Sequence, residues 1–445
     1  MFGGYAVLLC RAVFVFFLFA APGYSADLLR VYREALVNDP QYAAARAAAE
    51  AGREKLPQGL AGLLPTIGVS GSMSSNDNDY RVDRGARINK AFDAYAYTVT
   101  LSQPLFRWQN LVQYSQAKLQ VAHSEATFAQ ASQDLILRVA RTYFDVLNAQ
   151  ENLKALRASK EAIAHQLEQA QKSFAAGLVT ATDPQEAQSR FDLALAQEIA
   201  AETELAVRRY ALWALVGKEM GELNRLKTDA VLNPPQPAVM DSWVEAARAD
   251  SFLVQAQQAA YEAAAKEVER VRAAHYPTLD IVGNYGRART QAGIAATNLL
   301  QSEISNIGVQ ITVPIFQGGY VNSKTREAIA VRAAAGAMLE SARRSAELEA
   351  RRSFLGALNG IAQARALQAA LRSSVRALES NRLAYDIGVR INIDVLNAEN
   401  QAYVTRRDLN KASFDALLAL LQLKASVGAL GETDLEQINR LFEAP

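Results

Sequence analysis

The segment Gln103-Pro104-Leu105-Phe106 is followed by a stretch, residues 107–175, that contains no proline and no glycine. A single helix over this stretch would rise about 1.5 Å per residue and reach roughly 100 Å. An average globular helix has only about 11–12 residues. The stretch therefore predicts a helix too long for a compact domain, and such a helix needs other helices packed along its length.

The motif that precedes this helix occurs a second time in the chain. Val313-Pro314-Ile315-Phe316 comes before another long helical stretch, residues 320–386. Three markers that follow the first helix recur after the second at one constant spacing: Gly177 as Gly388, Asp183 as Asp394 and Gly217 as Gly428. A constant spacing over separate markers indicates a tandem duplication.

The duplication divides the chain into two repeats and three additional segments. We predict a signal peptide at 1–26, a first repeat at 27–216, an equatorial linker at 217–240, a second repeat at 241–428 and a C-terminal equatorial tail at 429–445. Each repeat should hold a helix, a β-hairpin, a long helix and a return helix. The predicted hairpins are 64–106 and 276–316, the long helices are 107–175 and 320–386, and the return helices are 184–216 and 395–427.

Local patterns support these elements. In the first hairpin, Tyr95, Tyr97, Val99 and Leu101 alternate with small or polar residues, the period of a strand with one apolar face. The polar segment between the two strands, from Ser74 to about Lys90, is expected to be a loop. Each long helix is expected to end at a glycine, Gly177 or Gly388, in the left-handed conformation that suits a helix C-terminus.

The first 26 residues have the layout of a secretory signal peptide. Arg11 precedes the apolar run 12–20, and the small residues Gly23 and Ser25 follow it. The run is too short to cross a bilayer as a helix, although a retained membrane anchor is the alternative interpretation. The sole cysteine, Cys10, lies in this segment, so the exported protein would contain no disulfide. No later stretch approaches 18 consecutive apolar residues, which predicts either a soluble exported protein or a membrane barrel.

The four predicted strands suit a membrane barrel. Strands of about ten residues that alternate apolar and small polar residues have the length and period of outer-membrane strands. Their tyrosines, Tyr80, Tyr95, Tyr97 and Tyr285, suit the aromatic girdles at the membrane interfaces. A soluble β-sandwich would also alternate, but it would not need two very long helices. Four strands cannot close a barrel, and an open edge in lipid would leave backbone groups unpaired. Two subunits would give eight strands and a filled interior, so we expect three subunits or more.

The paired motifs of the two repeats resemble the TolC family of outer-membrane channel proteins. The resemblance is carried by Pro314-Ile315-Phe316-Gln317-Gly318-Gly319, Thr142-Tyr143-Phe144-Asp145-Val146-Leu147-Asn148-Ala149, Gly177-Leu178-Val179 and Tyr385-Asp386-Ile387-Gly388-Val389-Arg390. It implies an α+β membrane protein that forms a homotrimer, with a 12-stranded transmembrane barrel and a periplasmic α-barrel of long antiparallel helices. It also implies docking, through a periplasmic adaptor (membrane fusion) protein, to an inner-membrane ABC or proton-driven transporter. Members of this family serve type I protein secretion and multidrug efflux.

The resemblance also implies a gate. The turns at 176–183 and 387–394 should lie at the periplasmic end, closed at rest by links between helix pairs and narrowed by a ring of aspartates. The matching positions in this chain are Asp183, Tyr385, Arg390, Asp394 and Asn397. Asn397 stands where the family has a second ring aspartate. The constriction therefore loses one negative charge per subunit, which argues against a strongly cation-selective gate.

Each gate residue also has a purely structural interpretation. Asp183 stands before Pro184, with Glu186 three residues on, which is the pattern of a helix N-cap with a capping box. Asp394 lies near a helix start, where the helix dipole favours an acid. Arg390 fits a solvated surface cation, and Tyr385 fits simple helix packing.

The sequence contains no recognisable catalytic chemistry. The charge is balanced, with 47 basic and 46 acidic residues, so there is no electrostatic footprint for nucleic acid. The histidines His123, His165 and His275 have no acids at metal-ligand spacing, and we expect no metal and no cofactor. We find no P-loop and no nucleophile elbow, and therefore predict no enzyme.

The prediction is a passive export duct in the outer membrane of a Gram-negative bacterium, contacting outer-membrane lipid and extending into the periplasm. Two other classes stay open: a barrel-anchored structural or adhesive surface coiled coil, and a soluble periplasmic enzyme. An adhesin should carry a long passenger domain, whereas the outer loops expected here, 74–91 and 286–304, are short. The exported substrate, the transporter and the adaptor are not determined by the sequence.

Overall fold

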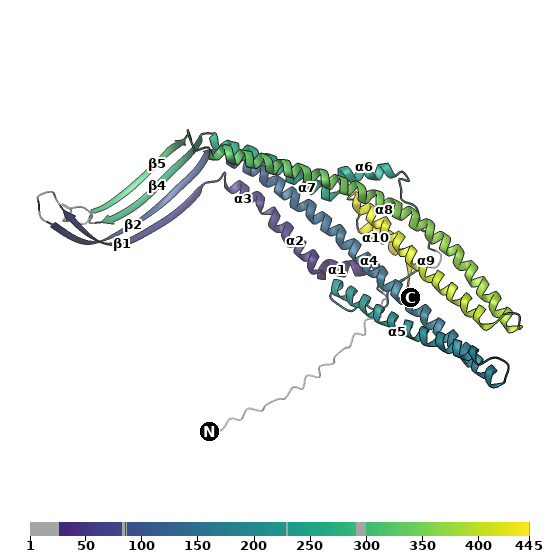
Figure 1. Ribbon diagram of the computed structural model, residues 1–445. Coiled ribbons are helices and arrows are strands. Elements are labelled where there is room, and N and C mark those ends of the chain that lie inside the picture. Colours follow the sequence, from purple (N-terminus) through teal and green to yellow (C-terminus); the bar gives the residue numbers. More distant parts are fainter. Residues whose placement is uncertain (1–25, 82–84, 86, 228–229, 291–299, 445) are drawn as a thin grey trace, which may run out of the picture.

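The computed structural model describes residues 26–81, 85, 87–227, 230–290 and 300–444. The predicted signal peptide lies outside the described residues except for Ala26. The molecule is long, with a curved β-sheet at one end and two helical hairpin tips at the other (Figure 1). This arrangement confirms the predicted fold class, because each repeat contributes one strand pair to the sheet and one long helical hairpin.

The helices of the first repeat are α1 (Leu28–Asn38), α2 (Pro40–Arg53), α3 (Lys55–Ala61), α4 (Trp108–Ala175) and α5 (Thr182–Val216). The second repeat holds α6 (Met240–Asp250), α7 (Phe252–Arg272), a short 3₁₀ turn (Ala273–His275), α8 (Tyr320–Asp386) and α9 (Asn392–Ser426). The tail adds α10 (Glu432–Asn439). Both return helices begin a few residues earlier than the 184 and 395 expected from the sequence.

The helix expected at the start of the first repeat is instead three helices, and the first break has a clear cause. Pro40 has no backbone N–H and cannot continue a helix from α1. Asp39 accepts a hydrogen bond from the Tyr42 backbone N–H at 2.9 Å and so caps α2. Arg138 of α4 forms an ion pair with the buried Asp39 carboxylate at 2.6 Å. This pair lowers the pKa of Asp39 against the opposing effect of burial, which is the largest single influence on it.

The sheet has the strand order β1-β2-β4-β5, with every neighbouring pair antiparallel. Its strands are β1 (Thr66–Arg81), β2 (Arg87–Phe106), β4 (Thr278–Thr290) and β5 (Leu300–Thr312). The prediction of strands of about ten residues is wrong, because these strands have 16, 20, 13 and 13 residues.

The predicted polar loop from Ser74 to Lys90 is also wrong for most of its length. Residues of this segment pair one for one across the hairpin, from Ser74 opposite Ala94 to Arg81 opposite Arg87. The Arg87 side chain forms an ion pair with Asp79 at 2.6 Å across the two strands. Cross-strand pairing of this kind outweighs the low strand propensity of Asn and Asp.

The main core lies midway along the helices, where the linker and the tail meet. The linker strand β3 (Arg225–Leu226) pairs with the tail strand β6 (Phe442–Glu443). Tyr143 of α4 is fully buried, and its hydroxyl donates to the carbonyl oxygens of Ala26 and Asn224, each at 3.1 Å. Phe144 stacks on Phe414 with ring centroids 5.3 Å apart. This core ties both repeats, the linker and the tail into one belt around the helices.

Within that belt, α8 and α9 approach each other closely at a glycine. A Cβ built at Gly360 would lie 3.0 Å from the Cβ of Ala416, so the two backbones approach too closely for a larger residue. None of the helices in the described part of the chain combines the length and apolar character needed to cross a bilayer.

Candidate functional site: a two-faced sheet and a polar tip

The sheet has two chemically different faces. The register places Ile67 opposite Leu101, Leu101 opposite Gly283, and Gly283 opposite Ile307, so these residues share one face. We call this the apolar face. Ile67 is 72% exposed and Ile307 is 76% exposed in the protomer. An apolar surface of this extent marks contact with a membrane or another protein.

The opposite face, which we call the polar face, carries small polar side chains. Ser70 pairs with Thr98, and Gly68 pairs with Thr100. Across the sheet on this face, Asn284 donates its backbone N–H and its side-chain amide to the side-chain Oδ1 of Asn306, both at 3.1 Å. The alternation of apolar and polar residues along each strand is the pattern of outer-membrane barrel strands, with lipid on one side and water on the other.

Aromatic side chains flank the apolar face at both ends. Tyr95, Tyr97 and Tyr285 lie toward the end farthest from the helices, as expected from the sequence. A second belt was missed, although the aromatic residues beside each strand–helix junction could have indicated it. Its exposed members are Phe106, Trp108, Tyr276, Phe316 and Tyr320. Rings at two levels are typical of proteins anchored at both interfaces of a bilayer.

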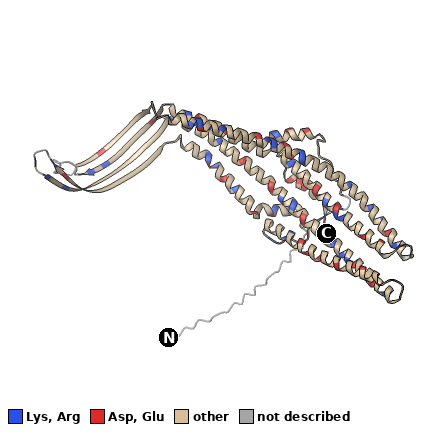
Figure 2. Cartoon of the chain, viewed as in Figure 1, with Lys and Arg blue, Asp and Glu red and all other residues tan. Residues whose placement is uncertain are grey.

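Tyr80 does not join the outer belt as the sequence suggested. It pairs with Ile88, and its even position in β1 places it on the polar face. Its hydroxyl accepts a hydrogen bond from the Asn78 side chain at 3.0 Å. Between the two belts the four strands carry no charged residue over 66–76, 94–106, 281–286 and 304–312. Figure 2 shows that the charged residues concentrate in the helices.

At the other end of the molecule both long helices end in the same motif. Gly177 has φ of +74° and Gly388 has φ of +78°. The Leu178 N–H donates to the Ser173 carbonyl at 2.9 Å, and the Val389 N–H donates to the Ala384 carbonyl at 2.8 Å. These are Schellman bonds, which complete the last helical turn and reverse the chain. The left-handed glycines expected at both tips are therefore confirmed.

Asp183 contacts the turn, but it is not the N-cap of α5 that the sequence suggested. The helix begins at Thr182, which places Asp183 inside its first turn. The Asp183 carboxylate accepts hydrogen bonds from the Thr180 backbone N–H at 3.1 Å and from the Thr180 hydroxyl at 3.2 Å. Glu186, expected to complete a capping box, instead forms an ion pair with Arg190 at 3.4 Å. The Thr180 N–H precedes the helix and has no acceptor within it, so it donates to the Asp183 carboxylate instead.

Arg390 and Asp394 contact each other at the second tip. The Arg390 guanidinium lies 3.4 Å from the Asp394 carboxylate, and Asp394 is in the first turn of α9. Tyr385 lies in the last turn of α8 and is half-buried. Within the described part of the protomer, no hydrogen bond or ion pair joins Asp183 to Arg390 or to Tyr385.

Asn397 links the two helical hairpins. Its side-chain oxygen accepts hydrogen bonds from the two terminal nitrogens of Arg190 on α5, at 3.4 and 3.5 Å. No sequence pattern singled out Arg190, because this contact joins residues in different repeats. An Asn–Arg hydrogen bond between exposed side chains stabilises the closed arrangement only weakly, so this link can be broken at low energetic cost.

Glu399 is the one strongly buried acid near this tip among the described residues. Its side chain is 12% exposed and lies 3.3 Å from Arg382 of α8. One of its carboxylate oxygens is buried with no hydrogen-bond partner. Burial raises the pKa of Glu399, and the positive charge of Arg382 opposes this only in part. The sequence did not single out this residue, since an isolated Glu in a helix resembles any surface acid.

Potential metal ligands are scattered. In the part of the chain that the structure describes, no three His, Cys, Asp or Glu side chains come together as a metal site would need. His123 instead contacts the Ala256 carbonyl oxygen through Nδ1, at 2.9 Å.

Comparison with known proteins agrees with this geometry. The model of a family described as outer membrane efflux protein matches residues 31–218 and 243–429, one match within each repeat. The chain is 30% identical over 418 residues to outer membrane protein TolC of Vibrio cholerae, covering 94% of both. It is 31% identical over 447 residues to the alkaline protease secretion protein AprF of Pseudomonas aeruginosa, covering 99% of this chain and 90% of that protein.

Solved structures show the same fold. The Campylobacter jejuni CmeC outer membrane channel matches with a TM-score of 0.76 at 20% identity, over 93% of this chain and 89% of that chain.

Proposed function

This chain belongs to the outer membrane efflux protein family, and we propose that it is the outer-membrane exit duct of a tripartite system for type I protein secretion. It is an outer-membrane export channel, as the family match over both repeats shows. The observation that carries the proposal is the two-faced sheet joined to long helical hairpins. A sheet with lipid on one face and water on the other lines a pore, and the hairpins extend that pore away from the membrane.

Assembly into a homotrimer is supported by two surfaces that one protomer leaves incomplete. β1 and β5 are edge strands, and unpaired edges are not tolerated in lipid. Three copies would close a barrel of 12 strands. The helices are also uncovered on one side: Ile199 and Tyr210 of α5 are 58% and 63% exposed, and Met338 of α8 is 63% exposed. Neighbouring subunits would bury these side chains.

The gate would lie at the hairpin tips. Asp183, Tyr385, Arg390, Asp394 and Asn397 all lie on or next to the two tip turns. The side-chain pairs among their contacts, Arg390–Asp394 and Arg190–Asn397, are weak surface pairs that each contribute about 0–1 kcal/mol. A periplasmic adaptor and an inner-membrane transporter could therefore open the tips by displacing a few weak contacts. We assign no catalytic role to the chain, and the energy for export comes from the transporter.

We propose a protein as the cargo because a relative that matches almost the whole chain is named for protein secretion. AprF is named for alkaline protease secretion and matches over 99% of this chain. Efflux of small molecules is the second candidate, supported by the family description. The adhesive alternative has less support, since only residues 82–86 separate β1 from β2 and leave no room there for a passenger domain.

The cargo can be tested in a bacterial strain that lacks its own exit duct. The strain would carry this chain together with a type I ABC transporter, its adaptor and a secreted protease. We expect protease activity in the medium, and no activity when the chain is omitted. Resistance to dyes and detergents would be measured in parallel with an efflux pump. Restored resistance without protease secretion would contradict protein as the cargo and favour small-molecule efflux.

A further inference from the structure

We propose that the outer rim of the apolar face binds the phosphorylated head group of an outer-leaflet lipid, with Arg289 as the anion-binding residue. The proposal rests on the outer-membrane placement of the sheet given above. It goes beyond the channel function, because it assigns a ligand to a surface that faces away from the pore.

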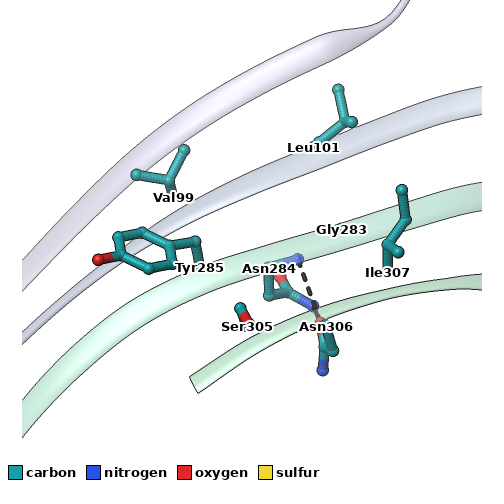
Figure 3. A pocket seen from close by; sticks show the side chains of 8 residues that line it. All are labelled: Val99, Leu101, Gly283, Asn284, Tyr285, Ser305, Asn306 and Ile307. Carbon is teal, nitrogen blue, oxygen red and sulfur yellow. Dashed lines mark hydrogen bonds between the residues drawn. The ribbon is translucent and has the colours of Figure 1, made fainter. Parts of the chain in front are cut away.

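Two shallow grooves lie in succession along the apolar face. The first has a volume of about 370 Å³ and forms where Gly283 leaves a gap between Leu101 and Ile307. Figure 3 shows this groove, with Val99 and Leu101 on one strand and Ile307 beyond Gly283. Its floor and walls are mainly apolar, which suits an acyl chain.

The second groove continues the first away from the helices and changes its chemistry. It has a volume of about 560 Å³ and is lined by Met73, Tyr95, Tyr97, Arg287 and Arg289 among others. Two arginines thus stand beside the outer aromatic belt, where the apolar face ends. This is the depth at which a lipid passes from acyl chains to its charged head group.

The two arginines are not equivalent. Arg287 is occupied, because its guanidinium lies 2.8 Å from the Glu303 carboxylate. Tyr285 donates its hydroxyl to the other oxygen of Glu303 at 2.8 Å, which holds that carboxylate in place. Arg289 has no hydrogen-bond or ion-pair partner among the described residues. A guanidinium with free donors binds a phosphate through two parallel hydrogen bonds.

The position of Arg289 identifies a lipid as the ligand. The register places it opposite Tyr95, on the apolar face rather than the polar face. A soluble anion in the channel would meet the polar face instead. The long helices lie at the opposite end of the sheet, so the rim with Arg289 is the outer rim of the barrel. Outer-leaflet lipid A carries both acyl chains and phosphates, which match the two grooves in that order.

Nearby acidic side chains limit how strongly this site can bind a lipid phosphate. Asp93 lies one row farther out on the same face, opposite Ser75, and competes with a phosphate for Arg289. Glu303 neutralises Arg287. Near a membrane surface a single arginine contributes about 1 kcal/mol to the binding of an anionic lipid, which corresponds to roughly a fivefold change in affinity.

The test measures binding of purified, detergent-solubilised channel to bis-phosphorylated lipid A, to dephosphorylated lipid A and to inorganic phosphate. We expect Arg289→Gln to weaken binding of bis-phosphorylated lipid A about fivefold. Glu303→Gln should strengthen it, because Arg287 is released. Lys90→Gln is the matched control: it removes one positive charge from the polar face of the same sheet and should leave binding unchanged.

Three outcomes would overturn the lipid site. They are unchanged binding in Arg289→Gln, equal binding of dephosphorylated lipid A, and displacement of lipid A by millimolar inorganic phosphate, which would indicate a plain anion site. Channel conductance in planar bilayers separates this proposal from the proposed function. A chain that conducts but binds bis-phosphorylated and dephosphorylated lipid A equally contradicts only the lipid site, whereas a chain that forms no channel contradicts the export function.

Discussion

At the scale of single residues, buried polar groups distinguish structural from functional roles. Tyr143 and Asp39 are buried and fully paired, the first with two carbonyl oxygens and the second with Arg138 and a helix N-terminus. Such satisfied groups hold the central belt together. Glu399 differs because one carboxylate oxygen has no partner. An unsatisfied buried acid destabilises its surroundings, and here those surroundings are the α8–α9 hairpin close to the tip.

Replacement of Glu399 by Gln should therefore stabilise the protein at neutral and higher pH, by on the order of 1 kcal/mol. The pKa of Glu399 is raised in the folded state, so its burial is unfavourable mainly above that pKa, where the group is charged. The gain in melting temperature should be largest near pH 8 and should shrink as the pH falls through the raised pKa. Below it, wild-type Glu399 is neutral like glutamine.

The matched control for this measurement is Glu379→Gln, which neutralises an exposed acid on α8. It should leave the melting temperature nearly unchanged at every pH. A gain in Glu399→Gln that is independent of pH would show that burial of charge is not the cause.

At the scale of elements, the two hairpins are built alike but are held differently. Each long helix ends at a left-handed glycine with the same Schellman bonds. In the first turn the Asp183 carboxylate accepts a hydrogen bond from the Thr180 N–H, and in the second turn Arg390 forms an ion pair with Asp394. The contact described between the hairpins at the tip is the pair Arg190–Asn397. The tips can therefore separate without disrupting either hairpin.

The double variant Arg390→Ser with Tyr385→Phe should raise the resting conductance of the channel in planar bilayers. Arg390→Ser removes the ion pair with Asp394, and Tyr385→Phe removes a hydroxyl from the last turn of α8. An exposed ion pair contributes at most about 1 kcal/mol. Arg344→Ser is a suitable control, because Arg344 forms a similar exposed pair with Glu340 in the middle of α8. Equal conductance in the double variant and the control would exclude a latch at these residues.

At the scale of the whole molecule, the sheet places the chain in the membrane. One face offers Ile67, Val309 and Ile307 to the surroundings, and the other offers serine, threonine and asparagine side chains. The helices supply the rest of the conduit, and their exposed apolar faces need neighbouring subunits. Membrane insertion and assembly are therefore coupled, because neither surface is complete in one protomer.

A charge should be tolerated on one face of the sheet and not on the other. Ile307→Arg places a cation on the apolar face, which near the bilayer midplane costs about 2–4 kcal/mol. Thr100→Arg places the same cation on the polar face, where water can hydrate it. Folding into lipid vesicles, followed by gel mobility without heating, should show a defect for Ile307→Arg alone. Equal defects in both variants would contradict the assignment of faces.

Periodicity and spacing in the sequence were enough to determine the tandem duplication, the two long helices, their glycine ends and the alternation of the strands. These features depend on local backbone preferences and on side chains a few positions apart. The length of the strands was not determined in this way. The polar residues 74–81 form a strand only because residues 87–94 pair with them.

Only the tertiary structure decided which distant residues meet. Three contacts join segments far apart in the chain. They are the pairing of β2 with β4, the hydrogen bonds between Arg190 and Asn397, and the hydrogen bonds of the buried Tyr143 hydroxyl to Ala26 and Asn224. The same holds for Arg289, whose place on the apolar face follows from the register of the sheet. A shift of one residue would move every side chain of a strand to the other face. Such contacts arise from the packing of whole elements, which local sequence patterns do not encode.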